Sequence, residues 1–98
     1  MAINQKMKQE IINYLLQYEP VFIGVFGSYA RNRQTESSDL DLLVSFYKKL
    51  TLIDLSRIKN ELSDRLNIEI DLITRQSLHP KLKPYIEEDL QVIYHAQE

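Results

Sequence analysis

The feature that most limits how this chain can fold is the placement of its glycines. Among 98 residues there are only two, Gly24 and Gly27, three positions apart. Glycine adopts left-handed or crowded backbone conformations without the steric penalty that other residues meet. Gly27 closes the run Val21–Phe26, which is rich in β-branched and aromatic residues and apolar on both faces. We therefore predict a buried central strand that ends at Gly27, with Gly24 inside it only allowing close packing.

Hydrophobic periodicity predicts the other elements. Helices are expected over residues 3–18, 28–34, 52–66 and 81–89, and further strands over 39–46, 68–73 and 90–94. The short link between the first two strands permits an antiparallel pair, whereas the long helix after the second strand favours a parallel crossover. We predict a single domain over residues 1–98, of the α+β (two-layer α/β) class, with a mixed sheet of about four strands and helices packed on it.

Charge and composition exclude several classes of function. The net charge of −2 and the pI near 5.7 argue against broad electrostatic binding to DNA or RNA. The absence of cysteine excludes thiolate metal sites and cysteine nucleophiles, and it favours a reducing cytoplasm. We expect no targeting segment and no membrane association, because no apolar stretch approaches the roughly 20 residues that a span requires.

Two carboxylates open the second predicted strand. Side chains alternate between the two faces of a strand, so Asp39 and Asp41 share one face while Leu40 and Leu42 point into the core. Like charges this close repel one another, and a bound cation relieves the repulsion. Oxygen ligands on a rigid element suit Mg²⁺, which commonly takes one or two carboxylates together with substrate phosphates.

A third carboxylate, Asp71, lies inside the apolar strand predicted over residues 68–73, where an unpaired charge is costly. If this strand neighbours the second one, Asp71 joins Asp39 and Asp41. Three carboxylates around one or two metal ions can clamp the attacking and leaving oxygens of a phosphoryl or nucleotidyl transfer.

The turn after the first strand offers a place for phosphates. Backbone N–H groups at Gly27 and Ser28 can hold a phosphate, and the missing side chain of Gly27 allows it to come close. The Ser28 hydroxyl adds a further contact. Arg31 and Arg33 follow within one or two turns and can hold the outer phosphate oxygens.

Each feature taken alone also has a simpler explanation. A Gly-Ser pair after a strand is usually just a turn, and Asp-x-Asp is commonly a polar strand edge or a cap. Asp71 could pair with Arg75 or Lys59, and the two arginines could be solvated surface. The combination is much more specific than any part of it, because all of these features occur in order along one short chain.

In this combination the chain resembles the minimal nucleotidyltransferases of the DNA polymerase beta superfamily. The motifs concerned are Gly27-Ser28-Tyr29-Ala30-Arg31, Ser38-Asp39-Leu40-Asp41-Leu42 and Ile70-Asp71-Leu72, and the likeness covers essentially the whole chain. The resemblance implies a nucleotidyltransferase fold and two-metal chemistry. It implies that Asp39 and Asp41 bind Mg²⁺, that Asp71 completes the metal site and helps to activate the acceptor hydroxyl, and that Gly27 and Ser28 hold the nucleotide phosphates. Asn32 stands where many relatives have glycine, and because asparagine tolerates a left-handed backbone better than most residues, the turn can be kept there.

The resemblance also implies a partner. Many members of the group are encoded beside a HEPN-domain ribonuclease toxin and act as its antitoxin by transferring AMP from ATP to one of its tyrosines. Two other functions stay open: a binding module that masks a toxin without catalysis, and a subunit that modifies a small aminoglycoside-type molecule. The acceptor, the nucleotide base and a homo-oligomeric state are not fixed by the sequence.

Overall fold

The computed structural model describes residues 3–30 and 39–96. Within these ranges the strands are β1 (Pro20–Phe26), β2 (Leu40–Phe46), β3 (Ile70–Thr74) and β4 (Gln91–His95). The α-helices are α1 (Gln5–Leu15), α2 (Leu52–Leu66) and α3 (Lys83–Asp89), and single-turn 3₁₀ helices lie at η1 (Leu16–Tyr18) and η2 (Arg75–Ser77). None of the helices in these ranges is long and apolar enough to cross a membrane.

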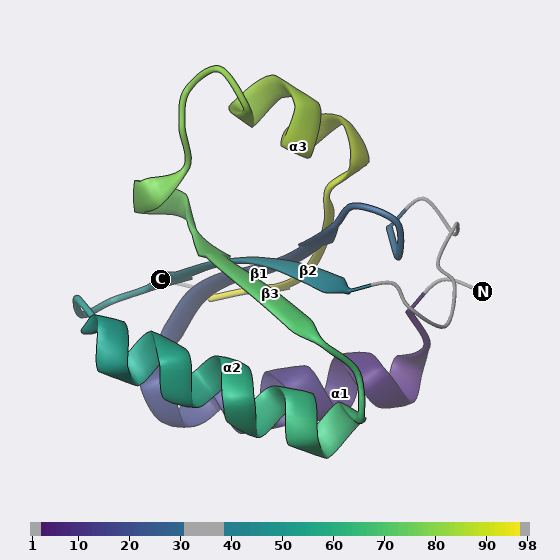
Figure 1. The fold of residues 1–98 in the computed structure, drawn as a ribbon, viewed down its shortest axis with the longest axis vertical. Coiled ribbons are helices and arrows are strands. Elements are labelled where there is room, and N and C mark those ends of the chain that lie inside the picture. The colour runs from purple at the N-terminus through teal and green to yellow at the C-terminus, as the bar shows by residue number, and fades with distance from the viewer. Residues whose placement is uncertain (1–2, 31–38, 97–98) are drawn as a thin grey trace.

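The strands form one mixed sheet in the order β3-β2-β1-β4. β1 pairs antiparallel with β2 and with β4, whereas β2 and β3 are parallel and are joined through α2. Helices α1 and α2 cover one face of this sheet, and α3 lies over the other (Figure 1). The α+β class, the antiparallel first pair and the parallel crossover that the sequence predicts are confirmed.

Local side-chain contacts explain where the helices begin. Asn4 caps α1 by accepting a hydrogen bond from the Met7 N–H at 2.8 Å. At α2 the Thr51 hydroxyl accepts from the Asp54 N–H, and the Asp54 carboxylate accepts from the Thr51 N–H. This reciprocal capping box satisfies donors that would otherwise be unpaired at the helix end.

The core lies between the sheet and the two long helices. Fully buried residues of β1 and β2 (Ile23, Val25, Leu40, Leu42 and Val44) pack against those of α1 and α2 (Ile11, Leu15, Ile58 and Leu62). On each strand these residues alternate with others that face α3. Burial of this side of the sheet therefore fixes which residues the strands present on the opposite side.

Some element boundaries differ from the prediction. The regular helix predicted over residues 3–18 ends at Leu15 and finishes as η1, after which Glu19 adopts a left-handed conformation with φ 57°. The helix predicted over residues 28–34 is a turn from Gly27 to Ala30, and its remainder lies outside the described residues. β3 begins at Ile70 rather than at residue 68, because left-handed Asn67 ends α2 and the chain then turns into the strand.

Candidate active site

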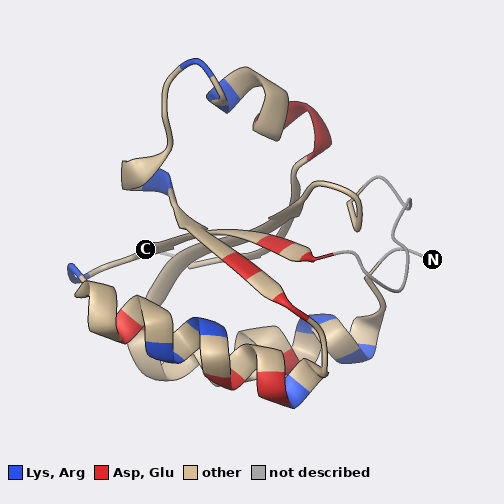
Figure 2. Ribbon diagram, viewed as in Figure 1, with Lys and Arg blue, Asp and Glu red and all other residues tan. Residues whose placement is uncertain are grey.

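Two candidate carboxylates lie side by side on neighbouring parallel strands. The register pairs Asp41 of β2 with Asp71 of β3, in the same ladder that pairs Leu40 with Ile70. Adjacent strands are about 4.8 Å apart, so the two side chains emerge next to each other. Figure 2 shows these acidic positions at the start of both strands. The predicted adjacency of the strands that carry Asp41 and Asp71 is confirmed.

Gly27 lies directly against the side chain of Asp41, in a backbone conformation that favours glycine. It has a φ of +76°, a left-handed conformation that residues with a Cβ rarely adopt. A Cβ placed on Gly27 would overlap with Asp41 Oδ2 and would lie 3.1 Å from Asp41 Cγ. This contact follows from the register, since Phe26 pairs with Asp41 across β1 and β2. The missing side chain of Gly27 therefore makes room for the Asp41 carboxylate, which is a reason that the sequence alone did not reveal.

Asp39 lies directly before β2 and is exposed. The N–H of the next residue, Leu40, donates to the Glu69 carbonyl at 2.9 Å, so the main chain runs beside residue 69 at this point. Glu69 is exposed as well, and this main-chain bond brings it, as a fourth acidic residue, to the same end of the sheet. Sequence reasoning did not select Glu69, although its spacing of two from Asp71 was a usable signal.

The donor set of this end of the sheet fits Mg²⁺. Carboxylate oxygens from one or two residues, completed by substrate phosphates, are the usual protein ligands of this ion. Among residues 3–30 and 39–96, no three side chains of Asp, Glu, His or Cys converge closely enough to hold a metal ion together. The structure thus brings together the pair Asp41 and Asp71, and the recruitment of exposed Asp39 as a third ligand stays a prediction.

The turn after β1 is anchored on both sides. Tyr29 is buried against the core, and the Ala30 carbonyl accepts a hydrogen bond from Gln91 Nε2 of β4 at 2.9 Å. Ser28, between them and Gly27, is half-buried. These contacts hold the turn next to Asp41, as phosphate binding by Gly27 and Ser28 would require. Arg31 and Arg33, also predicted to hold phosphates, lie outside the described residues.

The face of the sheet that carries the carboxylates is hollowed further along β2. A cavity of about 380 Å³ lies between β1, β2 and the segment that carries α3, and Phe22, Leu43 and Leu90 contribute to its lining. Leu43 follows Asp41 by two residues and therefore faces the same way. Arg75, suggested as a partner of Asp71, lies with its guanidinium carbon 4.6 Å from the centre of the Phe22 ring. Neither Asp41 nor Asp71 is among the described residues that line this cavity, so it lies further along the strands than the carboxylate pair.

The mixed sheet with paired carboxylates on the face opposite α1 and α2 is the architecture of a nucleotidyltransferase. A family model described as "Polymerase beta, Nucleotidyltransferase" matches residues 9–98, and the chain belongs to this family. It is accordingly an enzyme of the nucleotidyltransferase class, as the sequence predicted.

Two further comparisons agree with this assignment. A protein of Methanocaldococcus jannaschii, named provisionally as a protein adenylyltransferase, is 47% identical over 89 residues, which cover 90% of this chain and 88% of the relative. A solved structure, described provisionally as a minimal nucleotidyltransferase, is 31% identical with a TM-score of 0.78, and the match covers 89% of both chains.

The fold also recurs in a toxin–antitoxin complex. The solved structure of a tri-AMPylated HEPN toxin of Shewanella oneidensis in complex with an MNT antitoxin contains a chain with a TM-score of 0.78 to this one. The two chains are 21% identical, and the match covers 96% of this chain and 74% of the other. At that identity the likeness concerns the fold.

Proposed function

We propose that this nucleotidyltransferase transfers AMP from ATP to a tyrosine hydroxyl of a HEPN-domain toxin and thereby acts as its antitoxin. The observation that carries the proposal is the pairing of Asp41 with Asp71 across parallel strands, with Gly27 making room for the Asp41 carboxylate. The adenylyltransferase name of the M. jannaschii relative and the AMPylated toxin in the Shewanella complex support the choice of reaction and partner. A reaction that consumes ATP and silences a ribonuclease is one that we expect in the cytoplasm.

In this reaction the tyrosine oxygen attacks the α-phosphorus of ATP. The new bond joins that oxygen to phosphorus, the bond to the β-phosphate oxygen breaks, and pyrophosphate leaves. Asp71, exposed at the start of β3, takes the proton of the hydroxyl. The N–H groups of Gly27 and Ser28 hold the phosphates in line with the acceptor, with Arg31 and Arg33 on the outer oxygens.

One or two Mg²⁺ ions would be held by Asp39, Asp41 and Asp71. Bound there, Mg²⁺ supplies positive charge for the phosphate oxygens and for the carboxylates. The half-buried side chain of Asp41 lies against the Gly27 turn, so it orients the nucleotide relative to the acceptor.

The test is transfer of label from α-labelled ATP to the purified product of the neighbouring reading frame, which the proposal predicts to be a HEPN-domain protein. Wild type is compared with Asp39→Asn/Asp41→Asn, and with a control, Asp64→Asn/Glu88→Gln, that removes two exposed carboxylates elsewhere. We expect label on a tyrosine with wild type and control, loss of label with the Asp39/Asp41 variant, and loss on chelation of Mg²⁺. Equal labelling by all three proteins contradicts the site.

A cellular assay separates catalysis from masking. If Asp39→Asn/Asp41→Asn neutralises the toxin as well as wild type does, binding alone suffices and the enzyme's transfer is dispensable for protection. If purified wild type labels an aminoglycoside-type hydroxyl compound and leaves the HEPN protein unlabelled, the protein acceptor is wrong.

A further inference from the structure

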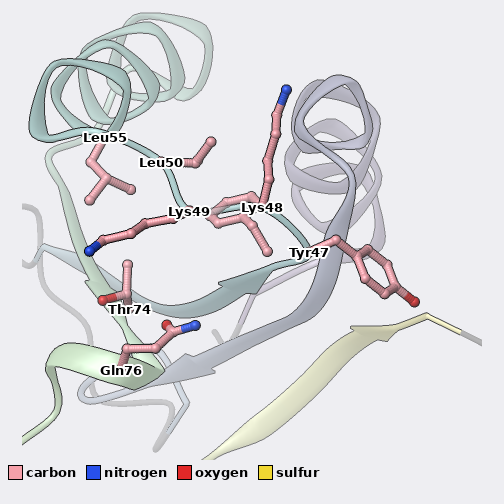
Figure 3. A pocket seen from close by; sticks show the side chains of 8 residues that line it. Tyr47, Lys48, Lys49, Leu50, Leu55, Thr74 and Gln76 are labelled. Carbon is pink, nitrogen blue, oxygen red and sulfur yellow. The ribbon is translucent and has the colours of Figure 1, made fainter.

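The end of β2 farthest from Asp41 forms a second distinctive region. Phe46, Leu50 and Leu55 contribute apolar walls to a cavity of about 460 Å³, and Lys49, Thr74 and Gln76 contribute polar ones. Figure 3 shows Leu55, Lys49 and Thr74 around a common space, with Tyr47 and Lys48 directed away from it. None of the described residues that line this cavity is acidic. The cavity therefore favours a ligand that is both apolar and anionic.

Three large apolar side chains between the end of β2 and the first turn of α2 are exposed and are not used by the fold. Tyr47, Leu52 and Ile53 are 61%, 85% and 72% exposed. The buried stripe of α2 consists of Ile58 and Leu62, so Leu52 and Ile53 lie off the side that packs on the sheet. Clustered exposed apolar residues with polar neighbours mark sites of protein association, and tyrosine is enriched among residues that dominate binding energy.

Charge gives the surface a preference among partners. The chain carries a net charge of −2, yet Lys48 and Lys49 are adjacent and no acidic residue occurs from Tyr47 to Ile53. The next carboxylate, Asp54, accepts a hydrogen bond from the Thr51 N–H in the capping box. Exposed Glu19, whose carbonyl accepts from the Tyr47 N–H, adds one negative charge beside the two lysines. The remaining positive charge attracts an acidic partner and speeds its association.

We propose that Tyr47, Lys48, Lys49, Leu52 and Ile53 form a docking surface, the β2–α2 surface, for an acidic and apolar segment of the protein acceptor. This inference rests on the proposed transfer to a protein. Asp41 and Phe46 lie at opposite ends of β2, about 16 Å apart at 3.3 Å per residue. A partner bound at the β2–α2 surface, at the end of β2 farthest from Asp41, leaves the carboxylates open.

The test measures binding of the HEPN-domain protein by calorimetry in the absence of nucleotide. Lys48→Glu/Lys49→Glu is compared with Lys59→Glu/Lys81→Glu, which makes the same change of charge at exposed positions of other segments. We expect at least a roughly 10-fold weaker Kd and a flatter salt dependence for the first variant, and little change for the second. Leu52→Ser/Ile53→Ser should weaken binding about 10-fold with the salt dependence retained.

The outcomes separate docking from transfer. Wild-type affinity in the Lys48/Lys49 and Leu52/Ile53 variants overturns the docking surface even where AMP transfer is intact. Loss of binding in these variants supports it even where no AMP is transferred, in which case the proposed function falls alone. Failure of wild type to bind the HEPN protein also overturns it. The docking surface is also overturned if wild type self-associates and Lys48→Glu/Lys49→Glu abolishes this self-association while leaving partner binding unchanged.

Discussion

The two faces of the sheet are built from the same strands, but one packs the core and the other carries the candidate active site. On the face covered by α1 and α2, the residues of β1 and β2 are fully buried, as Ile23, Val25 and Leu42 show. On the opposite face lie Asp41 and Asp71, and its cover, α3, has seven residues of which none is buried. Because alternate residues of a strand point to opposite faces, stability and chemistry can be varied separately.

The largest effect should come from the open face. We expect Asp71→Asn to slow AMP transfer by roughly 10³-fold, since metal and proton contacts of this kind are worth several kcal/mol. The free energy of unfolding should change by less than about 0.5 kcal/mol, as is usual for an exposed residue. Transfer kinetics and urea unfolding of the same preparation measure both. A large loss of stability would show that this face also supports the fold.

The covered face should give the opposite result. Leu62→Ala removes a fully buried side chain of α2, and we expect it to cost about 3 kcal/mol of unfolding free energy, mostly by leaving a cavity. Transfer measured where the variant is still folded should stay within a few-fold of wild type. Leu52→Ala, at an 85% exposed position of the same helix, is the matched control for stability and should change the free energy of unfolding by less than about 0.5 kcal/mol. A strongly impaired rate in folded Leu62→Ala would break the separation of the faces.

Gly27→Ala should affect both properties. The new Cβ requires a left-handed backbone at φ +76° and displaces the Asp41 carboxylate, so we expect a loss of about 2 kcal/mol in stability and a slower transfer. Gly24→Ala is the control. There the Cβ would lie 2.6 Å from Leu90 Cδ1, the end of a flexible side chain, so stability should fall while transfer persists. Equal transfer by both variants would contradict the coupling of Gly27 to Asp41.

The smallest effect concerns a polar contact within the covered half. The Tyr14 hydroxyl of α1 donates to Glu61 of α2, and burial followed by this hydrogen bond raises the pKa of Tyr14 above its ordinary value of 10.0. A raised pKa in the folded state stabilises the protein below pH 10, and this contribution is lost as the pH rises further. Tyr14→Phe should cost about 1 kcal/mol at pH 7 and weaken the alkaline loss. Chemical unfolding between pH 7 and 11 measures this, and an unchanged alkaline profile would assign that loss to other groups.

Much of the architecture could be predicted because local rules determine it. The spacing of Asp39, Leu40 and Asp41 gave the faces of β2, and the long helix before Asp71 gave the parallel neighbour. The helix predicted over residues 52–66 coincides with α2. These inferences require only periodicity, capping and the length of a connection, all of which are readable along the chain.

Other features depend on which side chain occupies a given space, and periodicity does not contain that information. The use of Gly27 to admit Asp41 required the register of β1 with β2. The hydrogen bond from Gln91 to Ala30 joins residues 61 positions apart in the chain. The exposure of Leu52 and Ile53 could be predicted, because they fall outside the buried stripe of Ile58 and Leu62. A docking role was inferred only when their exposure was considered together with Lys48 and Lys49.

The β2–β3 ladder spaces Asp41 and Asp71 by peptide hydrogen bonds rather than by loops. These main-chain hydrogen bonds do not depend on how side chains rearrange in the core. The spacing of the two residues is lost only when the strands separate. Heating should therefore leave the pair at working distance until the cooperative transition itself. The loss of transfer activity on heating and the loss of the folded state would then follow a single curve. Core side chains could be redesigned without a change in the spacing of Asp41 and Asp71.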